Sequence, residues 1–219
     1  MLRALADRRL AGEPLAWITG RAGFGDQSIL VAPGVYVPRW QSVELARRAG
    51  ARLPPDGKAI DLCTGSGAVA AALRTVRPAA RIVATDSDRR AVACARANGV
   101  EAFQGDLFAA VPDSFRGETD VVVAVVPYVP STAFHLLPRD TLRFEDASHY
   151  DGGPDGADVL RRVVSAAPDF LRPGGAVLLE LGGDQAEVLR PTLERLGFAS
   201  VRTWSDEDGD LRGLEATYG

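Results

Sequence analysis

The sequence predicts an α/β fold built on a seven-stranded, mostly parallel sheet that ends in an antiparallel hairpin. From about residue 58 onward, apolar runs of strand length alternate with segments of helical period, as in a parallel sheet covered by helices on both faces. A glycine-rich loop follows the first apolar run directly. The last two runs are joined by residues 205–212, too short for a crossover helix, so we expect these strands to pair antiparallel.

The expected strands are apolar runs bounded by turn-forming residues, at 58–63, 81–86, 100–104, 120–126, 176–181, 199–204 and 213–218. The expected helices between them have a 3.6-residue period, at 67–76, 88–97, 156–171 and 185–196. Asp88 is a good helix N-cap, Gly99 and Gly197 are typical helix stops, and residues 173–175 (Pro-Gly-Gly) predict a turn before the fifth strand.

Residues 1–40 have a different pattern, and we expect them to form a lead-in to a main domain at residues 41–219. The lead-in predicts a helix at 2–11 and strand-like pieces at 27–31 and 34–37. A helix at 42–53, stopped by two prolines, follows it. Residues 127–154 show no clear period and follow the fourth strand, so they predict a loop beside the ligand crevice of an α/β sheet.

The composition argues against several classes of protein. A net charge of −4 gives no basic surplus for duplex nucleic acid, and no apolar run approaches the roughly 20 residues that cross a bilayer. Cys63 and Cys94 form no CxxC pair, and His135 and His149 lack the spacing of metal ligands. We therefore expect no metal site, no membrane segment and a reducing, cytoplasmic location.

The glycine loop predicts a nucleoside-binding site. Gly65 and Gly67 allow a tight turn into a helix, and Asp86 ends the next strand, where a carboxylate can bind ribose hydroxyls. Asp61 precedes the loop, and its charge would repel a dinucleotide pyrophosphate, which favours S-adenosyl-L-methionine over NAD. After the third strand, Asp106 offers a carboxylate for an adenine amine. The alternative is that Asp106 is simply a turn residue.

The sequence resembles the HemK-like family of peptide chain release factor N(5)-glutamine methyltransferases. The motifs that carry the resemblance span nearly the whole chain: residues 12–20 (GEPLAWITG), 37–39, 61–67, 105–108, 151–156 (DGGPDG), 171–175 and 179–182. The resemblance implies a Rossmann-like class I S-adenosyl-L-methionine-dependent methyltransferase that modifies a protein glutamine of the Gly-Gly-Gln type, with a release factor as a possible partner. It also implies the cofactor-binding set Asp61, Cys63, Thr64, Gly65, Ser66, Gly67, Asp86, Asp106, Leu107 and Val125.

The expected substrate site departs from the family pattern at one position. The family carries Asn-Pro-Pro-Tyr after strand four, and its Asn side chain and the next backbone carbonyl accept the N–H groups of the substrate amide. Here the motif reads Val125, Val126, Pro127 and Tyr128. Valine accepts no hydrogen bond, and losing such a group commonly costs ~3–4 kcal/mol of transition-state stabilisation. Glutamine methylation is therefore in doubt, and no residue is assigned as a general base.

Two further departures concern the lead-in and the long loop. The family usually has a helical N-terminal domain that grips the release factor, whereas one helix precedes residue 12 here, so residues 1–40 are expected to be a remnant of that arm. Trp40 and Gln41 replace the usual residues after Arg39, and Trp40 is expected either to wall the pocket or simply to pack. His135 and His149 are expected to be surface residues.

Three alternatives remain open at the level of sequence. The chain could bind cofactor without appreciable turnover, since Val125 lacks an acceptor. It could methylate nucleic-acid adenine, because such enzymes also use an Asn/Asp-Pro-Pro-Tyr/Phe motif to hold a planar amine, but the acidic balance argues against this. An NAD-dependent oxidoreductase is the least favoured reading.

Overall fold

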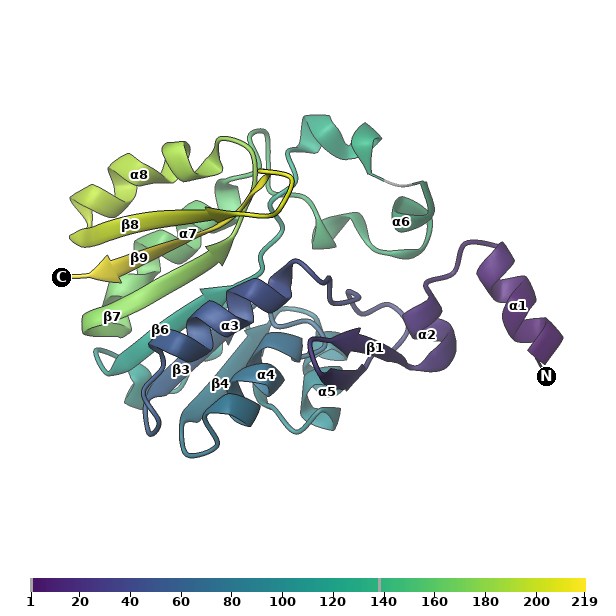
Figure 1. Cartoon of the computed structure of the whole chain (residues 1–219), viewed down its shortest axis with the longest axis horizontal. Helices are drawn as coiled ribbons and strands as arrows, with labels where there is room; N and C mark the ends of the chain where they lie inside the picture. Colours follow the sequence, from purple (N-terminus) through teal and green to yellow (C-terminus); the bar gives the residue numbers. More distant parts are fainter. Residues whose placement is uncertain (1, 138) are drawn as a thin grey trace.

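The computed structural model of the chain describes residues 2–137 and 139–219. One sheet has the strand order β5-β4-β3-β6-β7-β9-β8 (Figure 1), and only β9 runs antiparallel to its neighbours. The strands are β3 (Lys58–Leu62), β4 (Arg81–Asp86), β5 (Glu101–Gln104), β6 (Thr119–Ala124), β7 (Leu171–Glu180), β8 (Phe198–Ser205) and β9 (Leu211–Tyr218). The predicted seven-stranded fold with its C-terminal hairpin is confirmed.

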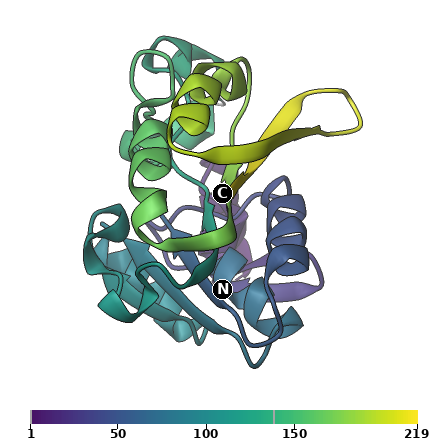
Figure 2. The same cartoon turned by 90° about the vertical axis from the view of Figure 1, so that its left-hand side faces the viewer.

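Helices cover both faces of the sheet (Figure 2). Alternate strand residues pack against each layer of helices. In β6 every residue is buried: Val121 and Val123 face one layer, whereas Val122 and Ala124 face the other. The first layer contains α3 (Ser42–Arg52), α4 (Ala68–Val76) and α5 (Arg89–Ala97), and the second contains α7 (Asp158–Ala166) and α8 (Gln185–Arg195).

The lead-in begins with α1 (Leu2–Leu10), which buries no residue and extends from the end of the molecule opposite the C-terminus (Figure 1). Helix α2 (Leu15–Thr19) and a hairpin of β1 (Arg21–Phe24) and β2 (Gln27–Leu30) follow. The buried Trp17 packs in the first core layer, and its indole N–H donates to the carbonyl of Val35 at 2.9 Å. Residues 16–35 are thus packed into the body of the fold.

Several boundaries differ from the prediction. The predicted turn at residues 173–175 is an irregular part of β7, which begins at Leu171 because Leu171 pairs with Thr119 on the neighbouring β6. The Arg172 side chain also donates to Asp120 at 2.6 Å. The predicted strand-like piece at 34–37 is a turn and extended coil. Helix α7 ends at Ala166, and a 3₁₀ turn with Pro168 in its first turn replaces the rest of the predicted helix.

Short elements make up the remainder. Helix α6 (Arg139–Phe144) lies in the long segment after β6, and 3₁₀ turns occur at η1 (Leu107–Ala110), η2 (Asp113–Phe115), η3 (Ser131–Leu136), η4 (Ala147–His149) and η5 (Ala167–Asp169). The predicted N-cap at Asp88 is confirmed, since its side chain accepts from the amide of Arg90. Over the described ranges, every helix is too short or too polar to cross a bilayer.

Candidate functional site

A cavity of about 630 Å³ opens where β3, β4 and β6 reach their carboxyl ends. This is the edge at which open α/β sheets bind ligands, and the volume suits a nucleoside-sized molecule. The cavity brings together seven of the residues predicted for the site: Cys63, Gly65, Asp86, Val125, Val126, Pro127 and Tyr128. A small adjoining hollow is lined by Thr64 and Ser66, together with Cys63 and Val125.

The loop between β3 and α4 turns sharply against this cavity. Cys63, Gly65 and Gly67 all have positive φ, at 54°, 56° and 81°. A β-carbon on Gly67 would lie 3.0 Å from the backbone of Ala95, so glycine lets the loop pack closely on α5. Cys63 has no such freedom, and a non-glycine residue in this conformation is a form of local strain that often marks functional sites.

Asp61 supports the loop from below without lining the cavity. Its side chain is 1% exposed, and one carboxyl oxygen accepts from the Thr64 hydroxyl at 2.6 Å and from the Ala70 amide at 3.1 Å. Burial raises the pKa of Asp61 to about 7, although both hydrogen bonds oppose the shift. The residue therefore acts on the cavity by holding the shape of the loop.

Asp86 lies at the end of β4 and does line the cavity. Its two oxygens accept from the amides of Gly65 and Asp88, each at 2.9 Å, which fixes the carboxyl group against the glycine loop. Burial raises the pKa of Asp86, and the two amide hydrogen bonds counteract that rise. Each oxygen keeps a further lone pair, so the group can still accept from ligand hydroxyls.

The predicted pair Asp106 and Leu107 lies outside the two hollows. The Asp106 carboxylate is exposed and accepts from Arg162 of α7 at 2.5 Å. Leu107 is buried in the core with φ of +49°, and its carbonyl accepts from the Thr85 hydroxyl at 2.7 Å. The pair therefore follows β5 beside the end of β4, where the Gly105 amide donates to the Asp86 carbonyl at 3.0 Å, but neither residue lines the two hollows.

The segment after β6 is anchored by a buried carboxylate on β7. The Tyr128 hydroxyl donates to Glu180 at 3.0 Å, and the Ser42 hydroxyl donates to the other oxygen at 2.6 Å. Glu180 is 3% exposed, and burial raises its pKa while both hydroxyls oppose the rise. The Tyr128 carbonyl also accepts from Gln185 at 2.6 Å. Tyr128 is thus fixed at both its hydroxyl and its backbone.

A second polar cluster forms the opposite wall. Arg39 donates to Glu145 at 2.8 Å and to the Tyr150 hydroxyl at 2.9 Å, and that hydroxyl donates to the other Glu145 oxygen at 2.5 Å. Arg39 also lies over the ring of Tyr36, whose pKa burial raises to about 12. These contacts tie the lead-in to the segment after β6.

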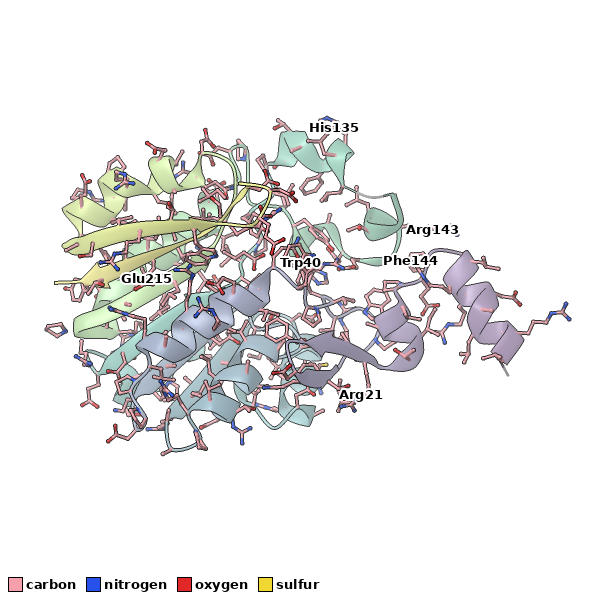
Figure 3. All side chains as sticks on the ribbon, viewed as in Figure 1. Arg21, Trp40, His135, Arg143, Phe144 and Glu215 are labelled. Carbon is pink, nitrogen blue, oxygen red and sulfur yellow. The ribbon has the colours of Figure 1, made fainter. Side chains whose placement is uncertain are left out.

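Two expectations about single residues change. His149 was expected at the surface, but its ring lines the cavity edge-on to Tyr36, and its Nδ1 is buried with no hydrogen-bond partner among the described residues. His135 is exposed as expected and projects from η3 (Figure 3). Trp40 is 68% exposed at the start of α3 and does not line the cavity (Figure 3).

Sequence reasoning missed several cavity residues. Arg39 and Glu180 lie inside motifs that carry the family resemblance, and Gln41 departs from the family pattern, so all three were detectable, whereas Tyr36 and His149 had no signal of their own. Within residues 2–137 and 139–219, no group of three or more His, Cys, Asp or Glu side chains could hold a metal ion.

Comparisons with known proteins agree with this geometry. Residues 45–129 match the family model "Methyltransferase small domain". The release factor glutamine methyltransferase of Geobacter sulfurreducens is 34% identical over 94% of this chain and 74% of the relative, and that of Neisseria gonorrhoeae is 38% identical over 96% and 77%. The solved structure of a methyltransferase from Pyrococcus furiosus shares the fold, with a TM-score of 0.61 at 19% identity over 100% of this chain and 97% of that one. The chain therefore belongs to the release factor glutamine methyltransferase family and has the fold of S-adenosyl-L-methionine-dependent methyltransferases.

Proposed function

We propose that the cavity binds S-adenosyl-L-methionine and that the chain transfers its methyl group to the side-chain amide of a protein glutamine. The observation that supports this most directly is that one cavity is lined both by the glycine loop with Asp86 and by residues 125–128. A methyl donor and its acceptor must meet within one enclosed space. We further propose that the substrate is a release factor with a Gly-Gly-Gln segment, as the relatives' names suggest.

The residues present fit the cofactor. Asp86 offers a fixed carboxyl for two ribose hydroxyls, and the positive-φ loop lets the backbone approach closely at Gly65, where a β-carbon would have no neighbour nearer than 3.9 Å. We propose that Thr64 and Ser66 border the amino-acid end of the cofactor, because they line the hollow next to Val125. Asp106 and Leu107 remain proposed adenine neighbours, which requires the Arg162 ion pair to rearrange.

When bound, S-adenosyl-L-methionine supplies a methyl group whose bond to sulfur breaks, with both electrons going to sulfur, as the new N–C bond forms. The chain's own task is to aim the weakly nucleophilic amide nitrogen and to exclude water. We propose that Tyr128 forms the rigid wall on the acceptor side, because Glu180 and Gln185 fix it at both ends. The proton lost from nitrogen passes to solvent, so no strong base is required.

We also propose how the remaining parts serve this function. Residues 1–40 act as a lead-in that completes the cavity wall through Tyr36 and Arg39, ahead of a methyltransferase domain at 41–219. A cytoplasmic location fits the unpaired thiols of Cys63 and Cys94. A second candidate, a cofactor-binding relative without turnover, is favoured by the missing acceptor at Val125.

Two measurements test the proposal. Calorimetric titration should show stoichiometric binding of S-adenosyl-L-methionine and none of NAD. Transfer of a radiolabelled methyl group should then occur to a Gly-Gly-Gln peptide but not to a Gly-Gly-Glu peptide or to RNA. Cofactor binding without transfer to any peptide would support the second candidate, and transfer to RNA would overturn the choice of a protein acceptor.

A further inference from the structure

The cavity contains polar atoms whose hydrogen-bonding capacity is unused. Among the described residues, three buried side-chain polar atoms have no partner: Gln41 Oε1, His149 Nδ1 and Trp204 Nε1. Two of these three, on Gln41 and His149, belong to residues that line the cavity. A buried polar atom without a partner destabilises the ligand-free protein, so a ligand that supplies the partner gains affinity from that contact.

Gln41 lies on the acceptor side of the cavity. The next residue, Ser42, donates to Glu180, and Glu180 accepts from Tyr128, so a chain of hydrogen bonds connects the start of α3 to the segment that begins at Val125. The small hollow against the glycine loop is lined by Ser42 but not by Gln41. Gln41 therefore lines the main cavity, which it shares with Glu180 and residues 125–128, and is absent from the small hollow that we assign to the amino-acid end of the cofactor.

Residues 125 and 126 provide no side-chain hydrogen-bond acceptor for the substrate amide, and the Glu180 carboxylate nearby already accepts from Ser42 and Tyr128. A primary amide brings two N–H donors into an enclosed site, and each must find an acceptor. Val125 has no side-chain acceptor, and Val126 is buried and apolar. The backbone after β6 can satisfy one N–H group, which leaves one donor without a partner.

We propose that Gln41 is a substrate-binding residue whose Oε1 accepts an N–H of the glutamine amide and thereby replaces the polar side chain absent at Val125. The inference rests on the proposed function. Oε1 is covered in the ligand-free chain, but the terminal amide torsion of glutamine is broad, so turning it towards the cavity costs little. Accepting this hydrogen bond increases the electron density on nitrogen and holds the amide group in one orientation.

The test is a double-mutant cycle between positions 41 and 125. Gln41→Leu keeps the approximate volume and removes the acceptor, and we expect it to lower kcat/KM for the Gly-Gly-Gln peptide roughly 10- to 100-fold while the cofactor Kd stays within about twofold. Val125→Asn should raise activity far more in the Gln41→Leu background than in the wild type, because each side chain supplies the same contact. Gln27→Leu, on the hairpin away from the cavity, is the matched control and should change neither parameter.

Each outcome decides the question. Rescue of Gln41→Leu by Val125→Asn supports the proposal, since a purely structural role for Gln41 would leave the loss uncorrected. Wild-type methylation that Gln41→Leu leaves unchanged refutes it while the proposed function stands. Loss of cofactor affinity in Gln41→Leu overturns the assignment to the acceptor side. A wild-type chain that neither methylates the peptide nor binds it, by calorimetry with S-adenosylhomocysteine present, removes the proposed function and this inference together.

Discussion

The buried Asp61 carboxyl should make the stability of the protein depend on pH in a defined direction. The pKa of Asp61 in the folded chain is about 7, whereas an aspartate in an unfolded chain has a pKa of roughly 3.9. Between these values the folded chain retains a proton that the unfolded chain has released. The contribution of Asp61 to the free energy of unfolding therefore falls as pH rises from about 4 to about 7 and is constant above that range.

The magnitude follows from the pH interval. Each pH unit over which only the unfolded chain is ionised contributes about 1.4 kcal/mol, so the interval from pH 5 to pH 7 is worth about 3 kcal/mol. Asp61→Asn cannot titrate, yet it keeps an oxygen for the Thr64 hydroxyl and the Ala70 amide. We expect the stability of the variant relative to the wild type to rise by about that amount between pH 5 and pH 8.

Urea denaturation followed by circular dichroism at pH 5, 6, 7 and 8 measures this difference. Asp155→Asn is the control: the Arg161 hydrogen bond lowers the pKa of Asp155 to about 2, so this carboxylate is ionised in folded and unfolded chains throughout the range. The difference in the free energy of unfolding between Asp155→Asn and the wild type should not vary with pH. If the free energies of unfolding of the wild type and Asp61→Asn change with pH in parallel, the reasoning is refuted.

Three further variants test the site. Gly67→Ala should destabilise the fold by about 2 kcal/mol or more, seen as a lower Tm, because its φ is +81° and its β-carbon would meet Ala95 at 3.0 Å; an unchanged Tm would contradict the loop geometry. Asp86→Ala should weaken cofactor binding roughly 10- to 100-fold by calorimetry, and an unaltered Kd would place the ribose elsewhere. Glu145→Gln should lower the free energy of unfolding by about 1–2 kcal/mol in urea, since Arg39 loses its charged partner; wild-type stability would show that the pair is dispensable.

The sheet was predictable because each of its strands is a local pattern. A short continuous apolar run such as β6 is typical of a strand that is buried on both faces of the sheet. The turn residues on either side of the run predict the ends of the strand to within one or two residues. The four-residue strand β1 and the short helix α2 were missed because neither is long enough to show a period. The predicted start of β7 was too late, since Leu171 joins the strand by pairing with Thr119, and no local pattern predicts that pairing.

The residues of the functional site also fall into those that the sequence predicts and those that only long-range contacts place. The glycine loop and Asp86 could be identified because their chemistry depends on neighbours in the chain. The pairing of Asp106 with Arg162 joins residues 56 apart, and no local pattern predicts it. His149 appeared to be a surface residue because its segment is polar, and only the packing of His149 and Tyr150 against Tyr36 places its ring in the cavity.

The Glu180 carboxylate, which accepts hydrogen bonds from Ser42 and Tyr128, also determines when the complete site can form during synthesis of the chain. Glu180 is 138 residues from Ser42 and 52 from Tyr128, so the three side chains meet only after most of the chain has emerged and β7 has docked beside β6. A nascent chain that ends before β7 already carries the glycine loop and Asp86, yet it lacks the group that fixes Tyr128. Synthesis should therefore complete the nucleoside half of the cavity before the acceptor half, and methyl transfer should begin only once β7 has been added.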